Sequence, residues 1–200
     1  MATLSRIGGV VIVAELHLAP GSRLPMRSVP SVVIETARGI VGDRYHGSRH
    51  RQVSVQSLTA LAEAEELFGA PIPAGLTRRN VTLSSGEVPR DPGALIRLGP
   101  ALLEVVRVAA PCKLLDDTIG RGAQEALRRR GGSICRVLVG GTVAVGDRVL
   151  LPAVGEPDDG VDHDRPAGDH AEDDQQAVSA AHASSLASPR HLTNGLSGST

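Results

Sequence analysis

Cys112 stands in the stretch "APCK", directly after a proline and directly before Lys113, the only lysine of the chain. A thiolate is both a nucleophile and a soft metal ligand, and positive charge nearby favours it over the thiol. Most free cysteines are instead small buried hydrophobes, and Cys135, in "SICRVLV", fits that role. Cys112 ends an apolar run at a proline, where barrels present functional groups, so a buried thiol and a functional thiolate both stay open for it.

Arginines gather in two stretches that precede Cys112. "RLPMRS" places Arg27 beside Ser28, and this pair can offer a phosphate both a charge and a hydroxyl donor. "GIVGDRYHGSRHRQVSV" places Arg44 in a Gly-Asp-Arg turn and follows it with further cations. Crowded cations repel one another unless an anion faces them. Asp43 of this turn is as well suited to brace Arg44 as to touch a ligand.

A third stretch, "LTRRNVTL", combines adjacent arginines with an asparagine at the start of a β-branched run. In an extended segment Arg78 and Asn80 project to the same side and Arg79 to the other. One face of the segment would then offer a guanidinium and an amide together. These polar stretches and Cys112 are the candidate binding residues.

Composition divides the chain into two parts. Residues 1–151 contain 19 Lys and Arg against 13 Asp and Glu, whereas residues 152–200 contain two arginines against nine acids. The second part is rich in Pro and Gly and then in Ala and Ser, too polar to bury a core, so we expect a domain over 1–151 and a disordered tail over 152–200.

The same composition limits the class of protein and its partners. No run approaches the roughly 20 apolar residues of a membrane span, so no membrane association is expected. Two aromatic residues leave almost no platform for stacked bases, which argues against nucleic acid. Two cysteines make no disulfide framework, and the first apolar run passes into Glu15, as in a first strand rather than a signal peptide. We therefore expect a cytoplasmic protein.

Short β-branched runs separated by Gly and Pro indicate a mainly β fold, an antiparallel barrel or sandwich. Two helices are predicted, over residues 57–69 and 119–132, the first from a serine or threonine cap and a closing glycine. The strands are predicted over residues 8–19, 31–37, 51–57, 80–84, 94–99, 101–109, 134–141 and 141–152.

The chain resembles the MOSC domain over about residues 4–150, through the ordered stretches "APGSRLPMRSV", "GIVGDRYHG", "RQVSV", "LTRRNVTL", "GPALLEVVRVAAPCKLL" and "GGSICRVLVGGTVAVGDRV". This module is named after the C-terminal part of molybdenum-cofactor sulfurases and also occurs as a stand-alone bacterial protein. The resemblance implies a barrel-like fold and a site around one cysteine. In the family that cysteine is a ligand to the molybdenum of a pterin cofactor, molybdopterin, or has been proposed to carry a persulfide.

Matching residue by residue, the resemblance implies roles for six positions. Cys112 corresponds to the metal ligand or persulfide carrier. Arg27 and Ser28 correspond to a pair that contacts the pterin phosphate, while Arg78 and Asn80 correspond to residues that also hold the cofactor. Arg44 matches only the motif of its turn, without a defined role.

Three functions follow from this resemblance. The first is a molybdenum-dependent oxidoreductase that reduces N-hydroxylated compounds; because no electron-donor domain accompanies the matched stretches, we expect a separate reductase partner. The second is a sulfur carrier whose Cys112 receives a persulfide from a cysteine desulfurase. The third is a module that binds or passes the cofactor without catalysis.

Overall fold

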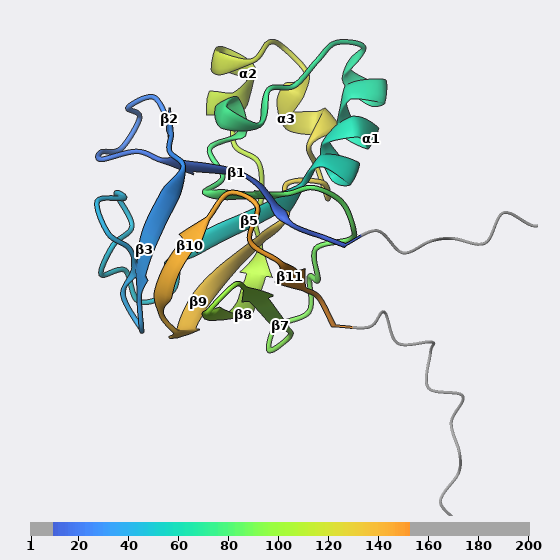
Figure 1. Ribbon diagram of the computed structural model, residues 1–200. Coiled ribbons are helices and arrows are strands. Elements are labelled where there is room, and N and C mark those ends of the chain that lie inside the picture. The colour runs from blue at the N-terminus through green and yellow to red at the C-terminus, as the bar shows by residue number, and fades with distance from the viewer. Residues whose placement is uncertain (1–9, 153–200) are drawn as a thin grey trace, which may run out of the picture. The chain divides into compact units, whose positions relative to one another are not determined.

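The computed structural model describes residues 10–152 (Figure 1). The predicted tail, 152–200, lies outside the described residues except for Pro152. Within residues 10–152, no helix is both long and apolar enough to cross a membrane. The strands are β1 (Val13–Leu18), β2 (Arg27–Ser28), β3 (Ser31–Glu35), β4 (Gly39–Ile40), β5 (Val53–Ser57), β6 (Val81–Leu83), β7 (Leu95–Leu98), β8 (Ala101–Val108), β9 (Ser133–Val139), β10 (Gly141–Ala144) and β11 (Val149–Leu150). The helices are α1 (Leu58–Phe68), α2 (Leu114–Thr118), α3 (Ala123–Ala126) and the 3₁₀ turn η1 (Ala74–Thr77).

The predicted mainly β, antiparallel fold is confirmed. Eight strands form one sheet in the order β11-β7-β8-β9-β5-β6-β1-β2, and three form a second in the order β10-β3-β4. Every pair is antiparallel except β5 with β6, whose connection passes through α1 and η1. Parallel neighbours need such a crossover because a hairpin cannot join them.

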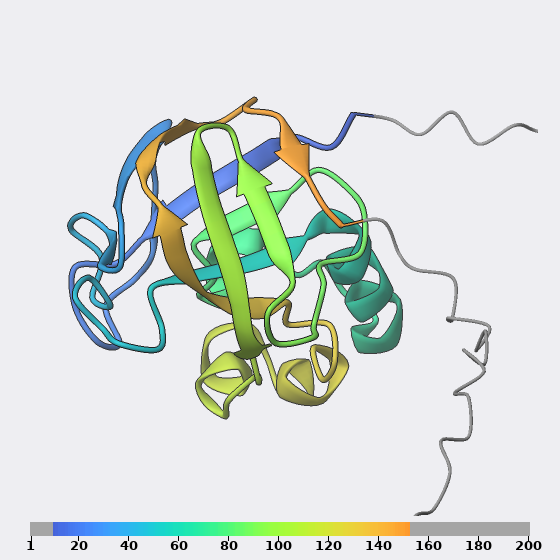
Figure 2. The same cartoon turned by 90° about the horizontal axis from the view of Figure 1, so that it is seen from below.

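The large sheet curves strongly but does not close into a full barrel (Figure 2). Its β11 end instead approaches the segment leading into β1. The amide of Val13 donates to the carbonyl of Asp147 at 2.9 Å, and that of Val149 donates to the carbonyl of Val11 at 2.8 Å. These bonds satisfy backbone groups that an open edge would leave exposed.

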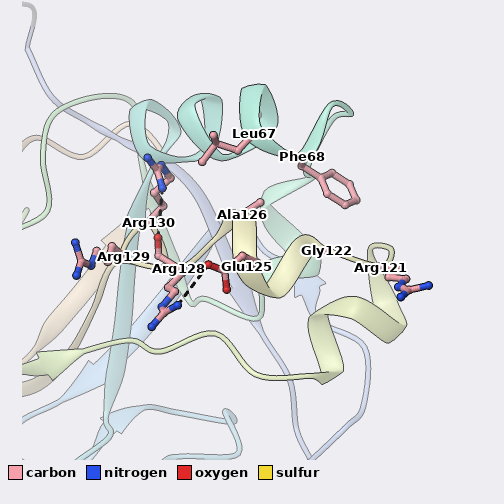
Figure 3. A pocket seen from close by; sticks show the side chains of 9 residues that line it. All are labelled: Leu67, Phe68, Arg121, Gly122, Glu125, Ala126, Arg128, Arg129 and Arg130. Carbon is pink, nitrogen blue, oxygen red and sulfur yellow. Dashed lines mark hydrogen bonds and ion pairs between the residues drawn. The ribbon is translucent and has the colours of Figure 1, made fainter.

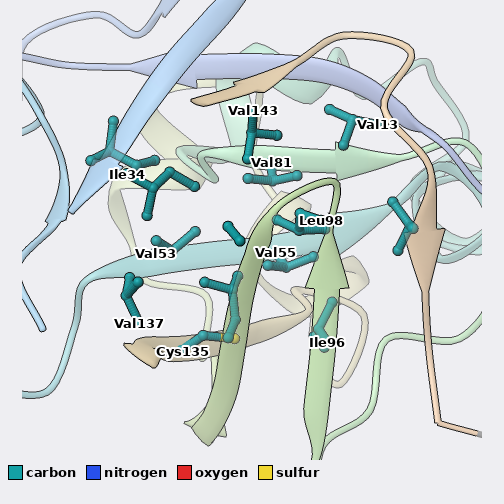
Figure 4. Packing of buried hydrophobic residues seen from close by; sticks show 14 of the residues in the cluster. Val13, Ile34, Val53, Val55, Val81, Ile96, Leu98, Cys135, Val137 and Val143 are labelled. Carbon is teal, nitrogen blue, oxygen red and sulfur yellow. The ribbon is translucent and has the colours of Figure 1, made fainter. Parts of the chain in front are cut away.

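Every second residue along the strands points into the interior of the curved sheet and fills it with aliphatic side chains (Figure 4). In β7, Ile96 and Leu98 are fully buried while Leu95 is 46% exposed, as the period of two along a strand requires. Val55, Leu103 and the other members of this cluster come from both sheets. This apolar burial is the main stabilising contribution to the domain.

A smaller apolar cluster lies under the helices, which gather at one end of the sheet (Figure 1). Helix α1 begins at Ser57, whose hydroxyl accepts from the amide of Ala60 at 3.3 Å, and ends at Gly69, where φ is 78°. Both caps agree with the sequence prediction. Leu61 from α1, Leu115 from α2 and Leu127 after α3 pack together beneath them.

The second predicted helix, 119–132, is much shorter than expected. Gly120 and Gly122 have positive φ and break the segment, leaving only α3. An additional helix, α2, precedes it and was not predicted. Gly132 then turns the chain into β9 with φ of 73°, and a Cβ there would collide with the carbonyl oxygen of Val55. Glycine is required at this position for both conformation and space.

Candidate functional site

Cys112 is exposed in the loop that links β8 to α2. Its carbonyl accepts a hydrogen bond from the amide of Leu115 at 2.9 Å, so the thiol stands at the first turn of α2. The other cysteine of the chain, Cys135, is fully buried on β9, and burial raises the pKa of its thiol to about 12. Thiolate chemistry therefore falls to Cys112, whereas Cys135 is a core residue as predicted.

Cys112 opens into a cavity of about 400 Å³, here called the thiol basin. Six of the residues that line it are cationic, and no described lining residue is a carboxylate. Positive charge concentrated in a partly enclosed hollow attracts an anion. The basin is lined by Ser22, Arg23, Arg44, Tyr45, Arg51, Thr77, Arg78, Arg79, Ala110, Cys112, Lys113, Leu114 and Leu115.

Arg44 is held in place by contacts on several sides. Its side chain is only 5% exposed and lies 3.4 Å from the carboxylate of Asp43. One of its terminal nitrogens also donates to the sulfur of Met26 at 3.2 Å, and the other donates to the carbonyl of Arg78 at 3.3 Å. The guanidinium thus has a defined position at the wall of the basin.

Asp43 and Asn80 form a buried network behind this wall. Asp43 Oδ2 accepts from the Nδ2 of Asn80 and from the amide of Ala19, both at 3.1 Å, and its Oδ1 accepts from the amide of Tyr45 at 3.0 Å. The Oδ1 of Asn80 accepts from the amide and hydroxyl of Ser54. Asp43 therefore braces Arg44 and the turn, one of the two roles that the sequence left open.

The predicted common face of Arg78 and Asn80 is wrong. Arg78 follows η1 with φ of 63°, so the segment is not extended there and the two side chains diverge. Arg78 lines the basin and donates to the carbonyl of Leu24 at 2.9 Å. Asn80 is 2% exposed and does not line the basin; its amide is bonded within the protein.

Arg79 reaches the same basin from a buried position. Its Nε donates to the carbonyl of Gly131 at 2.6 Å, and its Nη2 donates to that of Ala109 at 2.8 Å. Burial, and then repulsion from Arg51, lower the pKa of Arg79 to about 10, while the Cys112 thiolate acts in the opposite direction. A cation held by carbonyls alone leaves an unbalanced charge beside the thiol.

Arg51 has a buried donor in the wall of the basin that no described residue uses. Its Nε is buried and has no hydrogen-bond partner among the described residues. Its guanidinium lies 4.1 Å from the ring centroid of Tyr45, over which Arg44 also lies at 4.6 Å. Burial lowers the pKa of Arg51, and repulsion from Arg44 and Arg107 adds to this effect. Neither Arg51 nor Arg79 was among the predicted site residues, although the run of arginines around each was the available signal.

Arg27 and Ser28 lie outside the lining of the thiol basin. They form the short edge strand β2, where both are exposed and pair with Leu18 and His17 of β1. The structure therefore brings Cys112, Arg44 and Arg78 together, but places the predicted phosphate pair on a neighbouring edge.

A larger cavity, of about 800 Å³, lies between α1 and α3 (Figure 3). Leu67, exposed on α1, forms part of its wall. Arg128 in this cavity is paired with Glu125 at 3.4 Å, and Arg130 is paired with Glu63 at 3.3 Å. None of the residues that line it carries a nucleophilic thiol or hydroxyl, so the thiol basin is the better candidate site.

The family model of the MOSC domain matches residues 42–150, more than half of the chain and the whole segment from the Gly-Asp-Arg turn to β11. The chain belongs to the MOSC domain family. The match includes Cys112, Arg44, Arg51, Arg78 and Arg79, all of which line the basin.

Solved structures with the same fold agree with this assignment. The YuaD protein from Bacillus subtilis superposes with a TM-score of 0.61 at 20% identity, covering 70% of this MOSC protein and 94% of that chain. YiiM from Geobacillus stearothermophilus superposes with a TM-score of 0.56 at 19% identity, covering 70% and 74% of the two chains. A search of the curated proteins found no match.

Proposed function

We propose that this MOSC protein binds a molybdenum–pterin cofactor in the thiol basin, with Cys112 as a ligand of the metal. The observation that carries the proposal is an exposed thiol inside a hollow lined by six cations and no described carboxylate. A pterin phosphate is an anion, for which arginine offers charge and paired donors. A soft thiolate suits a transition metal far better than Mg or Ca.

The residues present fit such a group in size and in donor chemistry. A volume of about 400 Å³ lies in the range of small-molecule sites. Residues 10–152 contain no group of three or more His, Cys, Asp or Glu side chains that could hold a bare metal ion. A metal bound at Cys112 must therefore bring most of its ligands with it, as a metal–pterin cofactor does.

The chain's own residues would bind the anionic part of the cofactor and orient it. Arg51 has a free buried Nε to donate, and Arg44 is fixed by Asp43 and stacked on Tyr45, so both are ordered before an anion arrives. Such preorganisation lowers the entropic cost of binding. The bound cofactor would supply two-electron redox chemistry. We propose that this chemistry reduces N-hydroxylated compounds, with electrons from a separate reductase protein.

The cofactor proposal is tested by expression in a host that makes molybdenum cofactor. Molybdenum is measured by mass spectrometry and pterin by fluorescence of its oxidised form, in wild type, Cys112→Ser, Arg51→Ala and Arg121→Ala. Arg121 is an exposed arginine outside the basin and serves as the matched control. We expect near one cofactor per chain in wild type and the control, and at least a tenfold loss in the other two. Equal loading of all four proteins would refute the proposed site.

The exposure of Cys112 also favours a second function, a sulfur carrier. Here the Cys112 thiolate attacks the outer sulfur of a persulfide on a cysteine desulfurase; a new S–S bond forms on Cys112, and the desulfurase cysteine leaves as a thiolate. Intact mass after incubation with a desulfurase and cysteine would reveal one added sulfur atom, removable by dithiothreitol and absent in Cys112→Ser. If the protein loads cofactor but shows no reductase activity with a competent electron donor, the third function remains, a module that binds or passes the cofactor without catalysis.

A further inference from the structure

A second cavity, of about 560 Å³, adjoins the thiol basin and shares Arg23 and Arg78 with it. We call it the side pocket. It lies between β1, the loop after β1, the segment 73–76 around η1, and Thr118 at the end of α2. A molecule in the side pocket therefore has the two shared arginines between itself and Cys112.

One side of the side pocket is apolar and rigid. Pro25 and Met26 contribute from the loop after β1, and Pro73, Ala74 and Leu76 contribute from the opposite segment. The prolines have a fixed φ, so little entropy is lost when a ligand packs against them. Leu76 is 42% exposed, so binding would remove apolar surface from water.

The other side is polar and comes from β1. Glu15 and His17 are two residues apart on the strand and both line the side pocket, while Leu16 between them points into the core. His17 is 6% exposed, its Nε2 lies 3.5 Å from Glu15 Oε2, and its Nδ1 is buried without a hydrogen-bond partner. Burial lowers the pKa of His17, which keeps the imidazole neutral and able to accept.

Gly75 completes this polar end. A Cβ at Gly75 would lie 2.9 Å from His17 Nε2, so only glycine leaves room for the ring and for a group bound beside it. Glu15 is 43% exposed in its side chain and carries the negative charge of this end. Polar groups with unused acceptor capacity at the end of an apolar cavity are typical of a small-molecule site.

We propose that the side pocket binds the organic part of the substrate, a small neutral molecule with an apolar body and an N–H donor such as a carboxamide. The apolar wall holds the body, Glu15 and His17 accept from the N–H group, and the reacting end faces Cys112 past Arg23 and Arg78. This assignment of substrate class rests on the proposed function of the thiol basin. The negative charge of Glu15 disfavours carboxylic acids at the polar end.

The test uses the full-length, cofactor-free protein and benzamide as the probe. The chain has two methionines, Met1 and Met26, so methionine methyl labelling with ¹³C gives two NMR signals, and Met26→Leu assigns them. We expect a saturable shift of the Met26 signal on titration with benzamide. Acetophenone replaces the amide nitrogen by a methyl group at similar shape, and we expect it to bind at least fivefold more weakly.

Two variants locate the binding. Thr118→Trp fills the rim of the side pocket from an exposed position, and we expect the dissociation constant of benzamide to rise at least tenfold. Thr142→Trp, exposed on β10, is the matched control and should leave this dissociation constant unchanged. His17→Phe keeps a ring but removes both nitrogens, and should lower the preference for benzamide over acetophenone because Glu15 remains as the other acceptor.

Several results would overturn the assignment. No shift of Met26 up to the solubility limit of benzamide, or the same affinity in Thr118→Trp, excludes the side pocket. Equal binding of acetophenone to wild type excludes the N–H recognition. The benzamide titration needs no cofactor, so the two proposals can fail separately. A successful titration without molybdenum loading refutes only the proposed function. Molybdenum loading without benzamide binding refutes only the side pocket.

Discussion

Replacing Asp43 by asparagine tests the network that positions Arg44. The change keeps the shape of the side chain but removes its charge and converts one acceptor into a donor. Asp43 Oδ2 accepts from Ala19, Arg44 and Asn80, and Oδ1 accepts only from the amide of Tyr45. The new amide group will therefore turn its nitrogen toward Tyr45, which places two donors against each other.

The expected cost combines two buried defects. The Asp43 side chain is 0% exposed and that of Arg44 is 5% exposed, so the cation loses its carboxylate where water cannot replace it. Breaking such a buried pair from one side costs about 3–5 kcal/mol. The unpaired amide of Tyr45 adds about 1–3 kcal/mol if it finds no new partner. We expect a loss of at least about 4 kcal/mol, a large share of the roughly 5–15 kcal/mol that stabilises a domain.

Urea unfolding followed by circular dichroism measures this loss as a fall in the midpoint at constant slope. Asp91→Asn, an exposed position, is the matched control and should change the free energy of unfolding by less than about 0.5 kcal/mol. A loss below about 1 kcal/mol in Asp43→Asn would show that the turn holds Arg44 without the carboxylate, and would refute this account of the network.

Three further outcomes follow from the same structure. Iodoacetamide at pH 8 should label native protein once, on Cys112, because a thiol with a pKa of about 12 is ionised to only about one part in 10⁴; rapid native labelling of Cys135, read by peptide mapping, would contradict this. Gly132→Ala should lower the free energy of unfolding several-fold more than Gly122→Ala, because both glycines have positive φ but only a Cβ at Gly132 collides with the backbone of Val55. Similar urea midpoints of the two variants would count against this clash. The pKa of His17 is lowered in the folded state, whereas the unfolded state binds a proton at His17 below about pH 6.5, so the free energy of unfolding should fall as the pH drops through that value. His17→Gln should remove this part of the pH dependence, measured by urea unfolding at several pH values. An unchanged pH dependence in the variant would argue against it.

Local signals in the sequence identified the elements whose ends are set by neighbouring residues. The caps of α1 were predicted, as a serine or threonine at its start and Gly69 at its end, because a hydroxyl and a left-handed glycine act within one helical turn. The helix predicted over 119–132 was overextended at both ends, because the basic residues and closing glycines that indicated it do not fix where a helix starts and stops. In the fold, Gly120 and Gly122 have positive φ and delay the start of α3 to Ala123, and Arg129 has positive φ beyond its end.

The membership of the thiol basin could be predicted only in part. Cys112, Arg44 and Arg78 were found from residue type and motif, and all three line the basin. Arg51 and Arg79 were missed because their convergence depends on β5 lying between β9 and β6, a pairing that a single sequence does not specify. The register that buries Asn80 likewise comes from its contact with Ser54 of β5.

The two apolar clusters differ in size, and the loop that carries Cys112 is attached to the smaller, helical cluster. The loop that carries the thiol enters α2, and Leu115 of α2 packs only with the helical cluster. Arg44 and Arg51, by contrast, belong to the segment that leads into β5 and the large cluster. A small cooperative unit opens at lower free energy than the whole domain. We therefore expect the helices to open locally while the sheet stays folded. Such an opening would carry the thiol away from Arg44 and Arg51, and amide exchange in α2 and α3 would be faster than in β8 and β9.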